Sequence, residues 1–376
     1  MTRTDPKSNA PIMMLSAGNG FIMQSEKYSR DNAGQSLKKY ILLKQGELAY
    51  NHGASKAKQF GCCYELTEPE ARIPYVYHCF KINEDEYTPY VAMALNNAKM
   101  DQQLKRLVSS SVRMDGLLNI SFEDYMSVTL HLPSFFEQKH IADFLKKLDE
   151  RIAHQERLIT SLKKYKRGLL RTVFSEKGNP SLLHDAASHR IDEVCDVLSG
   201  KRIPKGETFS PRPTEYRYIT VSDMGEKYVC LDTLQFITSH TEKQIARYKV
   251  RNGDIIISVA GTLGKLNIIT PDLDRVNLTE NCDRFTNFRG INPEYLYHVL
   301  SSDLIQSQIE ASKTKNGQPK LALERIRNFV VPIPHQIRQE QFVGVMNSID
   351  KYIAAQQAVF DWCCKVRSGL LQQLFI

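Results

Sequence analysis

The most regular hydrophobic pattern in the chain lies in two stretches, residues 132–174 and 333–375. In both, apolar residues recur at steps of three and four, which is typical of an amphipathic helix with a partner helix. The recurring residues are Ile141, Leu145, Leu148, Ile152, Ile159, Leu162, Leu169 and Val173 in the first stretch, and Phe342, Met346, Ile349, Ile353, Phe360, Cys363, Leu370 and Leu374 in the second. Each stretch predicts a helix of about 40 residues and about 60 Å, too long for the core of one small domain.

The two stretches are copies of each other, because they align without a gap at a separation of 201 residues, with Phe174 matching Phe375. Upstream the similarity persists but the separation drifts. It is 204 between Pro89 and Pro293 and 207 between Gly46 and Gly253. A fixed separation in one part and a drifting one in another predicts a duplicated unit, with a helix of fixed length and a globular part whose loops vary.

A polar residue interrupts the two apolar stripes at equivalent places, Gln155 and Gln356. At a helix–helix seam a polar residue lowers stability but fixes the register of pairing. We therefore predict that the two helices pair with each other. The predicted seam comprises Leu148, Ile152, Gln155, Ile159, Ile349, Ile353, Gln356 and Phe360. The alternative is that each helix packs only on its own globular domain.

The globular parts mix strand and helix patterns, which predicts an α+β fold. Residues 216–221, 254–260 and 265–270 are rich in strand formers, residues 89–107 and 293–308 have helical spacing, and short strands are predicted at 128–132 and 329–333. The predicted domains are a first globular unit (1–133), a long helix (134–178), a linker (179–189), a second globular unit (190–333) and a second long helix (334–376).

Composition excludes a disordered chain, since 42% of the 376 residues are hydrophobic and 24% are charged. The net charge of +8 permits a polyanionic partner without requiring one. No apolar run approaches the roughly 18 residues that span a membrane, and no signal-peptide stretch follows Met1. The eight cysteines form no CxxC motif, so free thiols are expected. We expect a cytoplasmic protein of several domains.

Catalytic and cofactor motifs are missing from the sequence. The run at 261–265, Gly-Thr-Leu-Gly-Lys, is similar to a phosphate-binding loop, but Leu266 stands where that motif needs Ser or Thr. A turn between two strands is the better interpretation. We therefore expect a binding protein or scaffold with no catalytic, cofactor or metal site of its own. An enzyme with an unrecognised site is the remaining alternative.

Basic, polar loops recur at corresponding places in both units. Lys and Arg bind phosphates, whereas Ser, Asn, Gln and Arg can contact base edges. We predict DNA contacts at Lys201, Arg202, Lys205, Lys313, Lys315, Asn316 and Gln318 in the second unit, and at Asn51, Lys56, Lys58, Ser111 and Arg113 in the first. Taken singly, each loop is more often a solvated surface loop, and it is the recurrence in both units that makes DNA contact equally reasonable.

The repeat is similar to the DNA-specificity subunit of type I restriction–modification systems. The resemblance lies in the helix starts at 132–145 and 333–341, in Gly-Leu-Leu at 168–170 and 369–371, and in residues 200–206 and 253–256. It covers nearly the whole chain. It implies two target recognition domains in tandem, each reading one half of a bipartite double-stranded DNA target, and two long helices that pair as an antiparallel coiled coil.

The resemblance also implies partners. Two methyltransferase subunits would dock on the helices and methylate adenine with S-adenosylmethionine, and a restriction and translocase subunit would use ATP and Mg. The chain itself would be non-catalytic. One departure is that the second unit starts with residues 190–206, which have no counterpart in the first unit. A silent or truncated specificity cassette, or a stand-alone DNA-binding scaffold, is therefore the alternative function.

Overall fold

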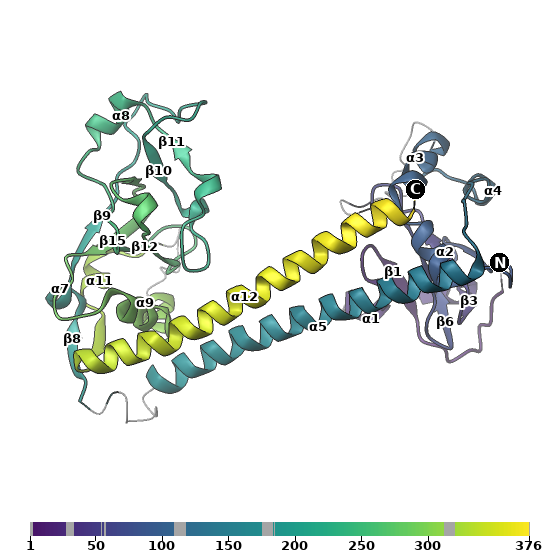
Figure 1. The fold of residues 1–376 in the computed structure, drawn as a ribbon, viewed down its shortest axis with the longest axis horizontal. Coiled ribbons are helices and arrows are strands. Elements are labelled where there is room, and N and C mark those ends of the chain that lie inside the picture. Colours follow the sequence, from purple (N-terminus) through teal and green to yellow (C-terminus); the bar gives the residue numbers. More distant parts are fainter. Residues whose placement is uncertain are drawn as a thin grey trace. The chain divides into compact units, whose positions relative to one another are not determined.

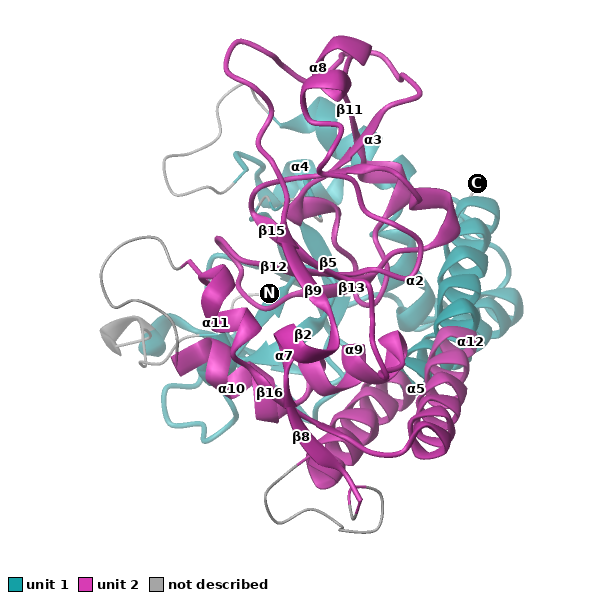
Figure 2. Cartoon of the chain, turned by 90° about the vertical axis from the view of Figure 1, so that its left-hand side faces the viewer, with its two compact units in different colours: residues 1–156, 357–376 teal, residues 157–356 magenta. Residues whose placement is uncertain are grey.

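The computed structural model describes residues 3–27, 34–53, 55, 58–108, 118–174, 183, 185–311 and 320–375. It divides into two compact units, one of residues 1–156 with 357–376 and one of residues 157–356 (Figures 1 and 2). Both predicted long helices are present, as α5 (Phe135–Phe174) and α12 (Gln336–Leu374). Each unit therefore combines a globular part with a segment of both helices.

Unit 2, residues 157–356, is built around a four-stranded sheet in the order β13-β12-β15-β9, with β12 fully buried. A second sheet has the strand order β11-β10-β14. A separate antiparallel pair is formed by β8 and β16. The strands are β8 (Ala187–Arg190), β9 (Asp196–Ser199), β10 (Arg217–Ile219), β11 (Gln235–Phe236), β12 (Ile255–Ser258), β13 (Leu266–Ile268), β14 (Asn277–Leu278), β15 (Cys282–Thr286) and β16 (Val330–Ile333). The helices are α7 (Ile191–Val194), η2 (Val221–Asp223), η3 (Leu231–Thr233), α8 (Ser239–Gln244), η4 (Pro271–Leu273), α9 (Pro293–Ser301), α10 (Asp303–Ala311) and α11 (Leu323–Arg327).

Unit 1 repeats the centre of this arrangement in fewer residues. Its sheet β5-β4-β7 has the same antiparallel order as β13-β12-β15. The strands are β1 (Met13–Ser16), β2 (Gly20–Met23), β3 (Ile41–Lys44), β4 (Leu48–Asn51), β5 (Cys62–Glu65), β6 (Glu70–Ile73) and β7 (His78–Phe80). The helices are α1 (Gln24–Lys27), η1 (Gly34–Lys39), α2 (Thr88–Ala94), α3 (Ala98–Leu107) and α4 (Phe122–Met126). The predicted α+β class is confirmed in both units.

The turn before the central strand is the same in the two units. Gly46 and Gly253 both have a positive φ, 80° and 84°, which glycine adopts without strain. The carboxylate of the next residue accepts a hydrogen bond from the backbone N–H three residues earlier. Glu47 accepts from Lys44 and Asp254 accepts from Arg251, both at 2.8 Å. The match at a separation of 207 is confirmed.

The helical stretches predicted at 89–107 and 293–308 each form two helices instead of one. Their N-caps, Tyr87 and Asn292, are 205 residues apart. The sequence match of Pro89 with Pro293 is therefore wrong by one residue, because Pro89 lies at the second helical position and Pro293 at the first. This register makes Tyr90 the equivalent of Tyr295.

The described part of unit 1 has no counterpart of the lead-in segment, residues 187–206, which carries β8, α7 and β9. In unit 2, β8 lies partly within the predicted linker and pairs with β16, which forms as predicted. The strand predicted at 128–132 is wrong, because its pairing partner is missing. Instead, the Gln103 amide donates to the Thr129 carbonyl (2.9 Å) and accepts from the Thr129 N–H (3.0 Å).

Within each unit the segments of α5 and α12 pack against each other in opposite directions. In unit 1, Asp149 binds Arg367, and Phe375 packs with Leu145. In unit 2, Lys166 binds Asp350 and the Phe174 ring lies 5.5 Å from that of Phe342. In both units, moving toward the C-terminus of α5 leads toward the N-terminus of α12, so the two segments are antiparallel. The two ion pairs occupy equivalent positions of the repeat. The acid lies on α5 in unit 1 and on α12 in unit 2, which is the helix that starts in that unit.

A buried glutamine fixes each long helix to its globular part. Gln138 accepts a hydrogen bond from the Tyr87 N–H (2.9 Å) and donates to the Pro133 carbonyl (2.9 Å). Gln339 does the same with the Asn292 N–H (2.8 Å) and the Pro334 carbonyl (2.9 Å). Both side chains are 1% exposed. The repeat thus preserves a joint between the start of the long helix and the first helix of the globular part.

Candidate nucleic-acid interface

The basic loop of unit 2 is held close to the turn between β14 and β15. Gly200 makes this approach possible, because an added Cβ would lie 2.0 Å from the Thr279 carbonyl oxygen. The Gly200 N–H donates to the Cys282 carbonyl at 3.0 Å, and the Lys201 N–H donates to the Leu278 carbonyl at 2.8 Å. The backbone therefore places the side chains that follow Gly200 beside residues 279–281.

Two of the predicted contact residues in this loop have defined partners. The Arg202 guanidinium binds Glu280 through Nε while its side chain stays 77% exposed. The Lys201 ammonium lies over the Tyr248 ring at 5.8 Å. Burial pushes the pKa of Glu280 up, but the hydrogen bonds from Arg202, from its own backbone N–H and from Thr279, together with the charge of Arg202, leave that pKa below its usual value. Lys205 lies exposed in the turn that follows.

A hollow of about 390 Å³, called here the Asn281 hollow, opens next to this ion pair. Its polar lining comprises Arg202, Thr220, Ser222, Thr279, Glu280 and Asn281. The aromatic rings of Phe209 and Tyr218, which also line it, meet edge to face at 5.6 Å. Among the residues that the structure describes, the Asn281 carboxamide has no hydrogen-bond partner. Sequence reasoning missed this residue, because a single asparagine between two strands carries no pattern.

Several predicted contact residues lie outside the described residues, and these remain predictions. They are Lys313, Lys315, Asn316 and Gln318 in unit 2, and Lys56, Ser111 and Arg113 in unit 1.

Two further predicted contact residues in unit 1, Asn51 and Lys58, form hydrogen bonds within the protein. Asn51 accepts a hydrogen bond from the Gly53 N–H at 3.0 Å. The Lys58 ammonium donates to the Asn96 carbonyl at 2.7 Å and is half-buried. These contacts give both side chains a structural role that the loop chemistry did not indicate. Their role in DNA binding stays a prediction.

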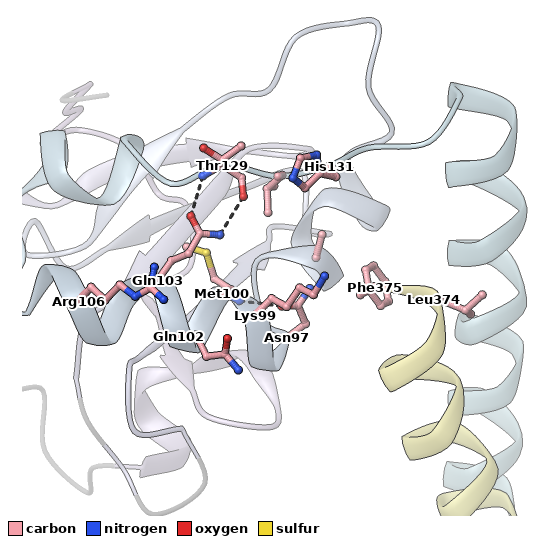
Figure 3. Close-up of a pocket in the computed structure, with 12 residues that line it drawn as sticks. Asn97, Lys99, Met100, Gln102, Gln103, Arg106, Thr129, His131, Leu374 and Phe375 are labelled. Atoms are coloured by element: carbon pink, nitrogen blue, oxygen red, sulfur yellow. Dashed lines mark hydrogen bonds between the residues drawn. The ribbon is translucent and has the colours of Figure 1, made fainter.

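Unit 1 instead carries basic residues on α3, around a hollow of about 370 Å³ (Figure 3). Lys99 and Arg106 line this hollow with Gln103 and His131. The equivalent helix of unit 2, α10, has no Lys or Arg. The adjacent pair Lys105-Arg106 was the signal available in the sequence, although a basic turn at a helix C-terminus is also favoured by the helix dipole.

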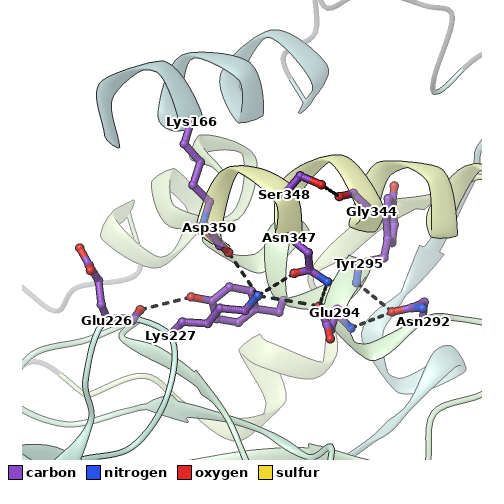
Figure 4. Close-up of polar contacts among 11 residues, drawn as sticks. Lys166, Glu226, Lys227, Asn292, Glu294, Tyr295, Gly344, Asn347, Ser348 and Asp350 are labelled. Atoms are coloured by element: carbon purple, nitrogen blue, oxygen red, sulfur yellow. Dashed lines mark hydrogen bonds and ion pairs between the residues drawn. The ribbon is translucent and has the colours of Figure 1, made fainter. Parts of the chain in front are cut away.

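A polar cluster around Lys227, Asn347 and Asp350, called here the Lys227 clamp, ties a loop of unit 2 to the long helix α12 (Figure 4). The Lys227 ammonium lies 2.9 Å from Asn347 Oδ1 and 3.2 Å from Asp350 Oδ2. It also lies 5.8 Å from the centre of the Tyr297 ring. Burial by itself raises the pKa of Asp350, but Lys166 and Lys227 outweigh burial and lower it.

The equivalent place in unit 1 is an open cavity of about 800 Å³, bordered by the Asp149–Arg367 ion pair. The aligned positions explain the difference, because Pro89 and Ala92 stand where unit 2 has Glu294 and Tyr297. Asp350 is repeated in unit 1 as Asp149, whereas Glu294 and Tyr297, which also contact Lys227, are particular to unit 2.

The predicted seam residues lie on covered faces of the long helices. Gln155 and Ile159 are buried, and Leu148, Ile152, Ile349, Ile353, Gln356 and Phe360 are half-buried.

In the described ranges no helix is long and apolar enough to cross a membrane, and no group of three potential metal ligands is found there. The run 261–265 forms a turn between β12 and β13, with the Gly264 N–H bound to the Ser258 carbonyl at 2.9 Å.

Residues 185–358, which lie almost wholly in unit 2, match the family model "Type I restriction modification DNA specificity domain". This segment is therefore similar to type I DNA specificity domains. Two curated type I specificity subunits are similar to it. The MjaVIII subunit of Methanocaldococcus jannaschii is 22% identical over 284 residues, which are 71% of this chain and 66% of the relative. The EcoBI subunit of Escherichia coli is 30% identical over 143 residues, 36% of this chain and 30% of the relative. The chain thus aligns with less than two thirds of each of these relatives.

Two solved structures from type I restriction–modification systems share the fold. One is described as showing complex assembly and conformational transition of the type I R-M system, and it matches with a TM-score of 0.58 at 17% identity, over 100% of this chain and 94% of that one. The S subunit from M. genitalium matches with a TM-score of 0.55 at 15% identity, over 99% and 90%. The resemblance to type I specificity subunits is confirmed, and both units of the chain fall within the shared fold.

Proposed function

We propose that this chain is the non-catalytic subunit that recognises DNA in a type I restriction–modification complex. Each unit is a target recognition domain that reads one half of a bipartite target, and the two long helices pair as an antiparallel coiled coil. The observation that carries the proposal is the repeated joint. Gln138 and Gln339 fix equivalent helix starts to equivalent globular parts, while the loops that differ between the units supply different readers.

Exposed apolar residues at equivalent positions on the long helices support two copies of one partner. Phe136 and Ile337 are 71% and 59% exposed and are 201 residues apart. Phe144 and Val345 repeat the relationship, and both are 53% exposed. Large apolar side chains exposed in this way favour protein interfaces. We propose that two methyltransferase subunits dock here and methylate adenine, with S-adenosylmethionine, ATP and Mg bound by the partner subunits and none by this chain.

A silent or truncated cassette is the alternative, and the missing lead-in segment of unit 1 is the observation that favours it. The Gln103–Thr129 pairing weighs against it, because a side chain satisfies the backbone groups at the position where unit 2 uses β8. Unit 1 also buries its own apolar clusters around Leu43 and Tyr50. We therefore favour a functional first reader of reduced size.

The test is to sequence methylated adenines in cells that express a type I methyltransferase subunit, with and without this chain. We expect methylation at one motif made of two separated half-sites, only when the chain is present. A continuous motif, or methylation that is unchanged without the chain, would contradict the proposal. Methylation of no motif together with DNA binding by the chain would identify the stand-alone scaffold.

Docking is tested separately by co-purification. Phe136→Asp and Ile337→Asp should each remove one of two methyltransferase copies, and the double variant should remove both. Met126→Asp, which changes an exposed apolar residue on α4, is the matched control and should leave the stoichiometry unchanged. Retention of both copies by the double variant would exclude this surface.

A further inference from the structure

The Asn281 hollow of unit 2 combines a rigid surrounding with an amide that has no hydrogen-bond partner among the described residues. We propose that the Asn281 carboxamide determines specificity by contacting the edge of one adenine in the half-site that unit 2 reads. This inference rests on the proposed function and deepens it. An asparagine amide can donate to adenine N7 and accept from its N6 amino group at the same time, which few other side chains do.

The backbone around Asn281 is fixed before any ligand binds. The Asn281 carbonyl accepts a hydrogen bond from the Val259 N–H at 2.8 Å, and the Cys282 N–H donates to the Thr279 carbonyl at 3.1 Å. Asn281 directly precedes β15, which is paired on both edges, with β12 and β9. A contact held in place in this way loses little conformational entropy on binding.

Another segment that lines the hollow, residues 220–222, is also ordered by its own hydrogen bonds. The Thr220 hydroxyl donates to Asp223 Oδ2 at 2.7 Å, and it lies 2.7 Å from the Ser222 hydroxyl. These bonds fix two hydroxyl groups in the same lining as Asn281. A base edge, which carries several donors and acceptors, fits such a lining better than an apolar ligand does.

Electrostatics at the rim favour the approach of DNA. Glu280 is the acidic group of the lining, and its carboxylate is bound by Arg202 and by the Thr279 hydroxyl at 3.0 Å. Its negative charge is therefore compensated locally. The exposed side of Arg202 adds positive charge at this rim, where phosphates would lie, and Lys201 precedes it in the same loop.

The hollow is particular to unit 2. Aligning the paired strands β4–β7 and β12–β15 places Pro74-Tyr75-Val76 where unit 2 has Thr279-Glu280-Asn281. Unit 1 therefore has neither the amide nor the acidic partner for an arginine at this turn. A change at Asn281 should affect one half-site and leave the other unaltered.

The test compares adenine methylation motifs produced by the full complex with wild-type chain, Asn281→Ala, Asn281→Asp and Asn252→Ala. Asn252 is an exposed asparagine in a turn of the same unit and is the matched control. Asn281→Ala should reduce discrimination at one position of one half-site about tenfold. Asn281→Asp keeps the shape but loses the donor, so the same position should no longer favour adenine.

The outcomes separate the two proposals. A wild-type complex that methylates no bipartite motif overturns the proposed function, whatever the variants do. A wild-type bipartite motif that all variants retain overturns the role of Asn281 alone. Equal loss of discrimination at every position in Asn281→Ala would also overturn it, because that pattern indicates general weakening of the complex. Binding of the purified variant chains to the methyltransferase should equal that of wild type, and a loss there counts against the inference.

Discussion

Units 1 and 2 share the joint to the long helices and the centre of the sheet, but they differ in the loops and in the elements added around that centre. Gln138 and Gln339 make the same bonds, and Asp149–Arg367 repeats as Asp350–Lys166. Unit 2 adds the lead-in segment, the Asn281 hollow and the Lys227 clamp, whereas unit 1 has an open cavity and a basic α3. The difference shows that the joint to the long helices can be kept while the surface loops of the globular parts vary.

The aromatic contact at the end of each long helix should give the largest effect on this comparison. Phe174→Ala removes a buried ring that packs on Tyr295 and Phe342, and it should lower the unfolding free energy of unit 2 by about 3–5 kcal/mol. Phe375→Ala should act similarly on unit 1, where the ring meets Tyr90. Chemical denaturation measures both effects. Phe136→Ala, at an exposed position, is the control, and an equal loss in that variant would contradict the assignment.

The buried glutamines come next. Gln339→Ala leaves the Asn292 N–H and the Pro334 carbonyl without partners, and it should cost about 1–3 kcal/mol. Gln138→Ala should cost a similar amount in unit 1. Gln336→Ala changes an exposed glutamine of the same helix and should have little effect. If one of the buried variants resembled this control, the two joints would not be equivalent.

The Lys227 clamp should make the stability of unit 2 depend on acid. The pKa of Asp350 is lowered in the folded state, so its contribution is present above the unfolded value of 3.8 and is lost as pH falls through the folded pKa. Asp350→Asn should therefore cost about 1–2 kcal/mol at neutral pH and reduce the loss of stability below pH 3.8. Denaturation curves between pH 2 and 7 measure this. An acid response that is unchanged in Asp350→Asn would show that other carboxylates cause it.

The smallest effect is expected for the Gln103–Thr129 hydrogen bonds, which in unit 1 take the place of the pairing with β8. Gln103→Ala should cost about 0.5–1 kcal/mol, because the two hydrogen bonds to Thr129 are exposed to water. Hydrogen exchange at the Thr129 amide should become faster. Gln102→Ala, at the adjacent exposed position, serves as the control. Protection of Thr129 that survives the loss of Gln103 would mean that another group replaces β8.

The sequence predicted the long helices and the repeat well, since a helical period over 40 residues depends on the residues themselves. It failed where an element depends on a partner. Residues 128–132 resemble 329–333 in composition but form no strand, because β8 is missing. Lys58 belongs to a basic loop, yet its ammonium is bound by the Asn96 carbonyl, a contact across 38 residues that no local pattern indicates. Asn281 was missed for the same reason, since the hollow forms from three separate segments.

The division of the long helices between the units has a consequence for synthesis. Unit 2 is continuous in sequence, at residues 157–356, whereas unit 1 needs residues 357–376 as well as 1–156. At about 5–20 residues per second, a ribosome takes about 10–40 s to make the intervening stretch. During this time the apolar surface around Tyr90, Ala142 and Leu145, which Phe375 covers in the folded unit, remains open. Unit 1, the first to be started, is therefore the last to be finished, and until then its uncovered surface is available to chaperones or to aggregation.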